Sequence, residues 1–566
     1  MKSRHSGIIN LVLVLIIIVV VNALSSYVNT SFDLTQDRRF TLTDPTVDLL
    51  EQLDKPIYVQ VLMAGKLPVE FQRLQDGVID MLEQYKKLTN GLVQYELVDP
   101  GAGSVEQINK KREDLSKERI FPMNIRVVDG DERKEQLVYP YVTFRLGERV
   151  NAVNVLESGS KNVSPEVQLN NSVSLLEYKY SNAIQKLMTP NTTNIAFLAG
   201  HGEYEKNQTI DLENNLRKFH NSGRLYLDSV YKIDERINLV IVAHPTKAFP
   251  EKHKFMLDQY LMKGGKIIWL VDKLNINMDS IRQNRRYVPF DYDLNLDDFF
   301  FKHGIRINSD LVQDLDATRI PLTVGQASGR PRFELYPWYY HILALPKQGH
   351  PITNNLDRVN MYFPSTIDTL KTKYKLHKEV LLTSSKNSRF QLTPVQLDLN
   401  VVRVPIVPEK FNKSFLPVGV LLEGQFASLY ENRVTKQMEE GLAALGETFS
   451  DKSVETKMLV ISDADVIFNK SKPGTDEFFS MGFNVYEGVE FANKPMILNS
   501  IEYMIGDGGI LQSRTKDLKL RLLDTVRARK EKLKWQLINV ASPLVLLIVF
   551  GILFQFWRRR KYGRKV

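Results

Sequence analysis

Two long apolar runs lie near the ends of the chain, and a polar body separates them. The first covers residues 8–24 and the second covers residues 537–557. About 20 apolar residues cross a bilayer, so the runs predict transmembrane helices over 8–25 and 537–557. A cleaved signal peptide is the alternative for the first run, because basic residues precede it and residues 23–25 resemble a cleavage site.

The tails outside the two runs carry only basic charge. Residues 1–7 and 558–566 contain eight Lys or Arg and no Asp or Glu, which predicts that both tails are cytoplasmic and that the body is translocated. Without those eight, the 75 Lys and Arg of the chain fall to 67, against 66 Asp and Glu. The body is therefore nearly neutral, and we expect no nucleic-acid partner.

A charged segment over residues 511–536 precedes the second run. Apolar residues recur in it among many Lys and Arg, which predicts a stalk helix that enters the span directly. A solvated connector and a lever that couples the body to the bilayer both remain open. Its basic residues suit anionic headgroups or the face of a partner, or they indicate the opposite topology.

The pattern over residues 30–190 predicts an α/β domain, for which a thioredoxin-like type is plausible. A βαβ unit begins it, because a strand-like run, an amphipathic helical stretch and a second strand-like run follow one another. The expected helices cover 45–53, a stretch through 71–85, and 173–187; the expected strands cover 56–62, 93–97, 125–128 and 136–144.

Residues 191–510 predict a second α/β domain. Short apolar runs at 194–199, 239–243, 266–271 and 458–461 alternate with helical patterns, which is typical of a doubly wound parallel sheet. Aromatic and proline residues replace this rhythm over 275–456, so we expect an insertion from which the chain returns to the sheet. The architecture resembles a class I glutamine-amidotransferase-like fold.

Polar residues follow each of the four apolar runs. The carboxyl ends of parallel strands meet at one edge, where doubly wound sheets bind ligands. A histidine with a carboxylate partner at that edge is typical of a hydrolase, whereas turn chemistry alone also favours Gly, Asp and Pro there. The candidate ligand crevice consists of Gly200, His201, Gly202, Glu203, His244, Asp272, Asp463 and Asp465.

Several kinds of chemistry are excluded by the sequence. The chain has no cysteine, so a lipoprotein anchor, disulfides, thiolate metal sites and the cysteine nucleophile of amidotransferases are absent. It also lacks a phosphate-binding P-loop, a complete dinucleotide fingerprint and a nucleophile elbow. We therefore predict no catalytic residue, no cofactor and no metal, and any energy input must come from a partner.

A combination of segments carries a resemblance to a known family. The chain resembles the auxiliary component of uncharacterised ABC transport systems, and in particular the gliding-motility-associated GldG family. The segments that carry the resemblance are residues 32–35, 38–43, 176–184, 200–203 and 264–265, together with Arg514 and Lys516.

This resemblance implies a subunit of the cell inner membrane with a periplasmic body. It implies a multi-span ABC permease and a separate ATPase as partners, beside the lipid bilayer and proteins of the envelope or motility machinery. We therefore expect a binding or coupling subunit that is not an enzyme. The alternative is a hydrolase that acts on the envelope, with its site in the crevice around His201 and His244.

Overall fold

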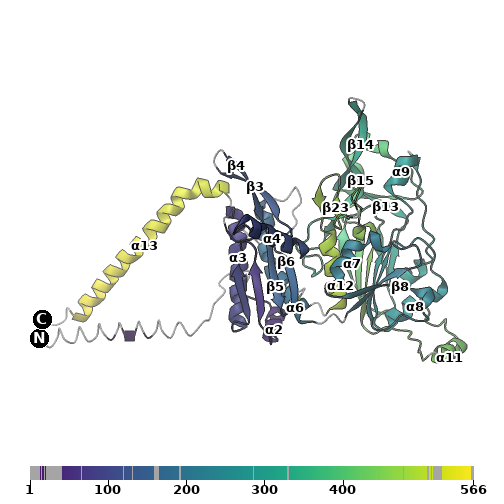
Figure 1. Ribbon diagram of the computed structural model, residues 1–566, viewed down its shortest axis with the longest axis horizontal. Coiled ribbons are helices and arrows are strands. Elements are labelled where there is room, and N and C mark those ends of the chain that lie inside the picture. The colour runs from purple at the N-terminus through teal and green to yellow at the C-terminus, as the bar shows by residue number, and fades with distance from the viewer. Residues whose placement is uncertain are drawn as a thin grey trace. The chain divides into compact units, whose positions relative to one another are not determined.

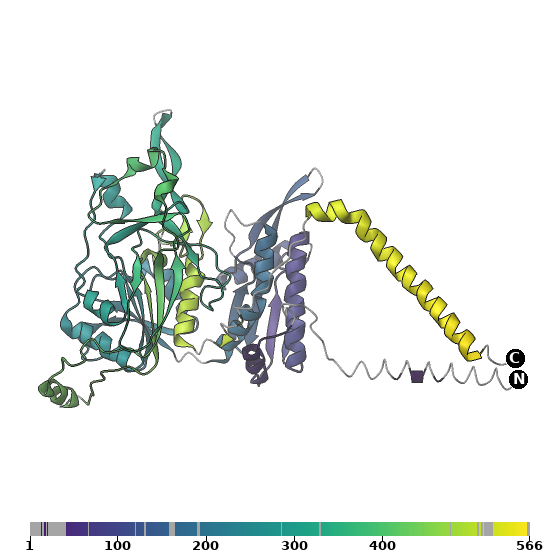
Figure 2. The same cartoon turned by 180° about the vertical axis from the view of Figure 1, so that it is seen from behind.

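The chain divides into two compact units, Met1–Asp517 and Leu518–Val566. The computed structural model describes residues 41–562 except 66, 119, 130–131, 158–164, 190–192, 285, 328–329, 445, 476, 507–508, 511–512 and 514–524. It also describes four positions of the first apolar run: Leu13, Ile16, Ile17 and Val20. The rest of the predicted first membrane helix lies outside the described residues. Figures 1 and 2 give two opposite views of the elements.

The N-terminal part of the first unit contains a four-stranded sheet in the order β2-β1-β5-β6. β1 (Ile57–Val61) and β2 (Val93–Leu97) are parallel and are joined by α3 (Val69–Leu88), as the βαβ pattern predicts. β5 (Tyr141–Leu146) runs antiparallel to β1 and forms a hairpin with β6 (Arg149–Asn154).

Helices pack against this sheet and bury its apolar side chains. The core contains Leu74, Val78, Phe144 and Ile184, each at most 1% exposed. Burying a side chain of this size stabilises a fold by roughly 1.5–3 kcal/mol. The other elements of this part are α2 (Asp44–Glu51), α4 (Val105–Lys117), β3 (Met123–Asp129), β4 (Glu132–Val138), α5 (Pro165–Ser174) and α6 (Leu176–Met188).

One predicted strand of this part is divided in two. The single strand expected over 136–144 is wrong: β4 ends at Val138 and pairs only with β3, whereas β5 begins at Tyr141 in the main sheet. Pro140 lies between them and cannot donate to a sheet ladder. The helix expected over 173–187 is confirmed as α6, which begins at Leu176, just after α5 ends at Ser174.

The second sheet contains five parallel strands in the order β8-β7-β9-β10-β22. The four short apolar runs of the sequence form four neighbouring strands of this set, and β8 is added at one edge. The strands are β7 (Asn194–Ala199), β8 (Asn221–Tyr226), β9 (Ile237–Ala243), β10 (Lys266–Leu270) and β22 (Thr456–Ile461).

The expectation of a wholly parallel sheet with a separate insertion is wrong. Residues expected to leave the sheet extend it beyond β22 with antiparallel strands, in the order β21-β18-β15-β14. Gly419 of β21, for example, pairs with Ile461 of β22. These strands are β14 (Ala317–Ala327), β15 (Arg330–Pro346), β18 (His377–Thr383) and β21 (Pro417–Gly424), and β16 (Val359–Asn360) pairs with β15.

Helices and short sheets cover this mixed sheet. One face packs side chains such as Leu212, Ile268 and Met496, and the other packs Phe249 and Trp269. The helices are α7 (Ile210–Leu216), α8 (Glu251–Met262), α9 (Met278–Asn284), α10 (Asp297–Lys302), α11 (Lys436–Ala444) and α12 (Asn493–Ile505). The short strand pairs are β11 (Arg286–Tyr287) with β20 (Leu397–Asp398), β12 (Ile305–Ile307) with β17 (Ile367–Thr369), β13 (Asp310–Asp314) with β19 (Ser388–Leu392), and β23 (Phe483–Asn484) with β24 (Val489–Glu490).

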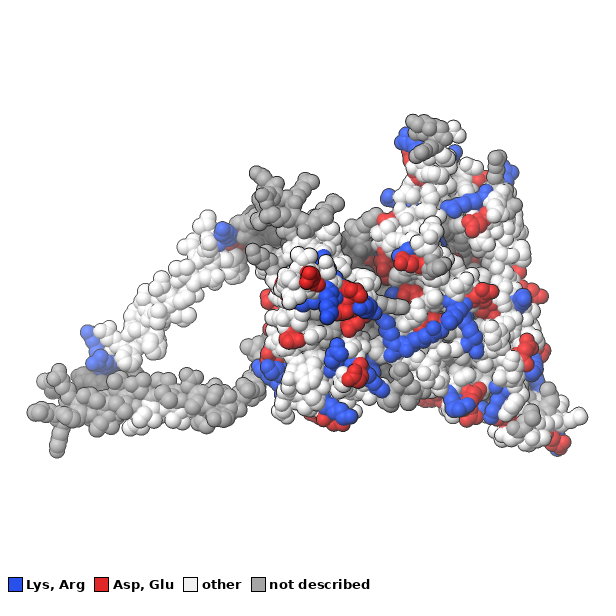
Figure 3. Space-filling view, viewed as in Figure 1, with Lys and Arg blue, Asp and Glu red and all other residues white. Residues whose placement is uncertain are grey.

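The second unit contains α13 (Thr525–Tyr562), a continuous helix. Residues Glu531–Arg560 make it, among the described residues, the only helix long and apolar enough to span a membrane by length and composition. In Figure 3 its middle is free of charge, whereas Lys and Arg lie at its two ends. On the visible face of the first unit, basic and acidic side chains are interspersed, as a nearly neutral body requires.

Candidate functional site

A histidine and an aspartate at neighbouring strand ends form the centre of the site. His244 directly follows β9, and Asp272 lies two residues after the parallel strand β10. The Nδ1 atom of His244 lies 2.5 Å from the Oδ2 atom of Asp272, whose Oδ1 atom accepts from the N–H of Ala464 at 3.1 Å. His244 has a φ of 58°, which is uncommon for a residue with a side chain. Its Nε2 atom has no hydrogen-bond partner among the described residues.

Two further carboxyl groups come from the turn after β22. Asp463 is completely buried, and its two oxygens accept from the backbone N–H groups of Tyr362 at 2.7 Å and Asp465 at 2.8 Å. The Oδ1 atom of Asp465 accepts from the hydroxyl of Tyr204 at 2.8 Å. With Asp272, three carboxyl groups therefore share one region.

Aromatic rings hold the imidazole of His244 in place. The ring of Tyr204 stacks on it with centroids 4.6 Å apart, and the ring of Tyr292 meets it edge-on at 6.0 Å. Phe468 packs against Tyr204 with ring centroids 5.2 Å apart. Packed rings restrict rotation of the imidazole, so its orientation is set before any ligand binds.

These groups border a cavity of about 730 Å³. Tyr204, His244, Asp272 and Asp465 line it, and the remaining wall is rich in aromatic and amide side chains. Ligand sites of proteins are commonly concave, with a few polar groups that converge on one space. This cavity has that form, and it lies where parallel sheets bind ligands.

Three cations also line the cavity, and among the described residues none of their side chains forms a hydrogen bond or an ion pair with an acidic side chain. Arg282 donates to the hydroxyl of Tyr486 at 3.2 Å, and the Nζ atom of Lys470 lies 5.8 Å from the centroid of the same ring. Arg319 donates its backbone N–H to Glu487 at 3.0 Å, which leaves its guanidinium for other partners. An anionic group of a ligand would find charge-assisted donors here.

Burial and mutual repulsion change the titration of the site. Burial, with the charges of Asp465 and Asp272, holds the pKa of Asp463 well above its usual range. Burial and the charge of Asp272 raise the pKa of Asp465 to about 6. Burial lowers the pKa of His244, but the hydrogen bond and charge of Asp272 outweigh it and leave the pKa raised. Such clusters of perturbed groups are enriched at functional sites.

The histidine expected in the same crevice lies elsewhere. His201 is 4% exposed, and its ring stacks on Phe249 with centroids 3.9 Å apart. Its Nδ1 atom lies 3.0 Å from Oε1 of Glu203, and its Nε2 atom lies 2.9 Å from Nδ1 of His253. The Nε2 atom of His253 in turn lies 3.1 Å from Asp228. His201 and Glu203 thus belong to a packed hydrogen-bond chain and do not line the cavity.

The two glycines around His201 set the direction of this turn. Gly200 and Gly202 have φ angles of 122° and 84°, which favour glycine. A Cβ atom on Gly202 would collide with Oγ1 of Thr246, whose N–H donates to the carbonyl of His201 at 2.8 Å. The glycines therefore serve the backbone geometry of the turn.

The predicted crevice is thus divided into two groups. His244, Asp272 and Asp465 line the cavity, and Asp463 is buried beside them. The group from 200 to 203 forms a separate turn, so placing it in the crevice was wrong. The described part of the chain contains no group of three or more His, Asp or Glu side chains that could hold a metal ion.

Sequence reasoning missed the aromatic and cationic wall. Tyr204 directly follows the expected glycine turn, so its position after β7 was a signal for it. The three cations lie in segments without clear periodicity, and no spacing motif connects them. The sequence could not have indicated that α9, β14 and the segment after β22 meet at one cavity.

Geometry defines the protein as a mixed α/β body with a polar cavity at the ends of its parallel strands. Comparison with known families adds a more specific identity. Residues 192–500 match the family described as "ABC-type uncharacterized transport system", which covers more than half of the chain. The chain belongs to this family of ABC transport auxiliary proteins.

Other comparisons add less. Residues 36–145 match a domain described as being of unknown function. No curated protein matches the chain. A solved structure described as "mmIFT52 N-terminal domain" is 14% identical and covers 56% of this chain and 99% of its own, with a TM-score of 0.31. A likeness at that score carries no argument.

Proposed function

We propose that this protein is a non-catalytic binding and coupling subunit of an ABC transporter that serves gliding motility. In this proposal the body lies in the periplasm, both termini are cytoplasmic, and two helices anchor the chain in the cell inner membrane. A separate ATPase supplies the energy, and a multi-span permease forms the route across the membrane. The family match supports the link to an ABC transport system.

The observation that carries the proposal is the cavity at the strand ends. Three carboxyl groups crowded together cost stability, because burial and repulsion raise the pKa values of Asp463 and Asp465. The crowded carboxyl groups do not stabilise the sheet. Binding of a ligand is therefore the best explanation for their presence. The ligand would present hydrogen-bond donors to Asp272 and Asp465, and an anionic group to the cations of the wall.

Coupling requires that the body be connected to the bilayer. Residues 525–536 of the charged segment and the apolar segment belong to one helix, Thr525–Tyr562, which favours transmission along this helix. Residues 514–524 of the expected stalk lie outside the described residues. Exposed apolar side chains such as Leu546, Val549 and Phe550 are available to lipid or to another helix. In the proposal, one side of α13 contacts the permease.

Site-specific photo-cross-linking from α13 tests this proposal. A photoreactive amino acid placed singly from residue 544 to residue 554 should cross-link to a multi-span protein in native membranes. The cross-links should recur every three or four positions, because helix contacts follow one face. Uniform labelling by lipid at every position, with no protein adduct, would contradict a coupling role.

The proposal includes the two fold types expected from the sequence, thioredoxin-like and amidotransferase-like. The order β2-β1-β5-β6, with one parallel pair followed by an antiparallel hairpin, supports a thioredoxin-like N-terminal domain. The parallel set in the second sheet supports an amidotransferase-like origin that has lost catalysis, since no cysteine is present.

An envelope-acting hydrolase is the second candidate, and one observation favours it. His244 has Nδ1 on Asp272 and a free Nε2 in a cavity, which is the geometry of a general base. His244→Asn separates the two functions, because asparagine can still donate to Asp272 but cannot transfer a proton. A binding subunit with this variant should keep its cellular function at normal protein levels. A hydrolase should lose it.

A further inference from the structure

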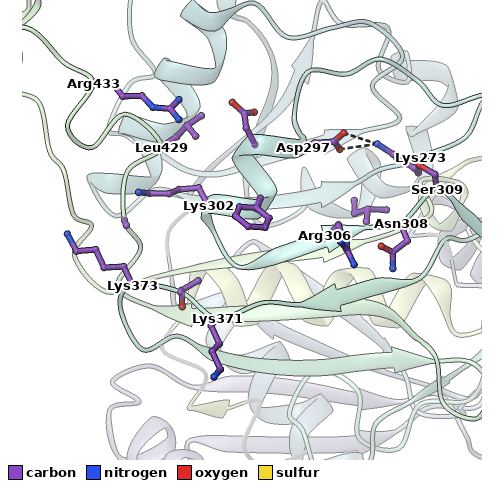
Figure 4. A pocket seen from close by; sticks show the side chains of 15 residues that line it. Lys273, Asp297, Lys302, Arg306, Asn308, Ser309, Lys371, Lys373, Leu429 and Arg433 are labelled. Carbon is purple, nitrogen blue, oxygen red and sulfur yellow. Dashed lines mark hydrogen bonds and ion pairs between the residues drawn. The ribbon is translucent and has the colours of Figure 1, made fainter.

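A second cavity, of about 800 Å³, shares no lining residue with the cavity at His244. Figure 4 shows it from close by. Its wall comes from the turn after β10, from α10, from β12 and the residues after it, and from the loops that follow β17 and β21. Ile307, Ala427 and Leu429 form its apolar part and are at most 7% exposed. Packed side chains from separate segments give such a cavity a fixed shape.

Positive charge dominates this second cavity. Six of its fifteen lining residues are Lys or Arg and two are Asp. Two of the cations have acids of their own: Lys273 lies 2.9 Å from Oδ1 of Asp297, and Arg306 lies 2.7 Å from Oδ2 of Asp368. The remaining cations are Lys302, Lys371, Lys373 and Arg433.

These four cations have only one carboxylate between them. Glu431 accepts from Lys302 at 3.1 Å and pairs with Lys373. Lys371 and Arg433 have no hydrogen-bond or ion-pair partner for their side chains among the described residues. In Figure 4, Arg433, Lys302 and Lys373 lie on one side of the cavity, away from the dashed ion pair. With Lys371, the four cations and the one carboxylate leave about three positive charges over in the cavity as a whole.

No other acid of the wall compensates this excess. Asp298 is held by the fully buried Lys254, whose Nζ atom lies 2.8 Å from Oδ2. The hydrogen bonds from Lys373 and Lys302 lower the pKa of Glu431. Glu431 is therefore ionised, and its single negative charge is the one included in the balance above. The excess is available to an anion from solution.

We propose that this cavity binds a phosphate group through Lys302, Lys371, Lys373 and Arg433. A phosphate offers several strong acceptors and about two negative charges, which matches three ammonium groups and one guanidinium. The apolar wall, with the side chain of Phe301 65% exposed beside it, accommodates the organic part of the ligand. Free phosphate compounds and phospholipid headgroups share this chemistry.

Isothermal titration of the full chain in an uncharged detergent tests the proposal with two probes. The probes are inorganic phosphate and a short-chain phosphatidylglycerol. The variant is Lys371→Gln with Arg433→Gln, chosen because neither side chain has a partner whose loss would disturb the fold. The control is Lys375→Gln with Arg112→Gln, which removes the same charge from residues that do not line the cavity.

We expect at least one probe to bind, and the double variant to bind it at least tenfold more weakly. The reason is that the loss of one charged hydrogen bond weakens binding by about tenfold. The control should keep its affinity within about twofold. Binding of phosphate alone would identify a free ligand, and binding of the lipid alone would identify a headgroup. Failure of both probes to bind, or equal binding by variant and control, would overturn the proposal.

Discussion

Asp465→Asn removes one of the crowded carboxylates and should stabilise the protein. The change keeps the shape of the side chain, and the amide oxygen can still accept from the hydroxyl of Tyr204. It also removes the charge that helps to raise the pKa of Asp463 and of His244. The expected result is a gain in the free energy of unfolding at neutral pH.

The magnitude follows from the pKa of Asp465. A carboxyl whose pKa rises from 3.8 to about 6 on folding binds its proton more tightly in the native state. Stability then falls as pH rises from about 4 to about 6 and stays reduced above, by roughly 3 kcal/mol. That value is an upper limit, because Asp465 lines the cavity and water screens its charge.

Thermal unfolding of the full chain in detergent, followed by the fluorescence of the buried Trp269 and Trp338, measures this effect. At pH 8 the variant should unfold a few degrees above the wild type, by roughly 4 °C at most. At pH 4 the two should coincide, because the carboxyl is then largely protonated in both folded and unfolded chains. An equal offset at both pH values, or a lower Tm for the variant at pH 8, would refute the reasoning.

Three further changes have defined outcomes. His201→Ala should destabilise the protein by about 3 kcal/mol in urea denaturation, because it leaves buried partners such as Glu203 unsatisfied, whereas His244→Ala should cost less than about half of that. Gly202→Ala should lower stability by at least about 1 kcal/mol in the same assay, since it meets both strain and a collision. Glu502→Gln should break the ion pair between α12 and α6 and raise amide hydrogen exchange in both helices, with unchanged exchange as the contrary result.

Much of the parallel sheet was predictable because its strands are short, continuous and apolar. The last five residues of β9 and the last four of β10 are all buried, so both faces of these stretches require apolar side chains. β8 was missed because it is a half-exposed edge strand with Gly223 in its middle, which leaves little pattern. β15 contains aromatic and proline residues in no simple period, because its partners change along its length.

The candidate site was half predictable for a related reason. Alternation of strands and helices predicts parallel strands whose carboxyl ends share one edge, so the meeting of His244 with Asp272 could be expected. The direction of a side chain within a turn depends on backbone angles that only the tertiary structure fixes. The angles of Gly200 and Gly202 turn His201 into the core, and no spacing in the sequence indicates it.

The most direct test of the central claim is co-purification of the tagged full-length chain from its native membrane in a mild detergent, with mass spectrometry of its companions. The account predicts that a multi-span permease and an ATPase with a P-loop accompany the chain in stable proportion. Recovery of the chain alone at good yield, under conditions that preserve other membrane complexes, would contradict it.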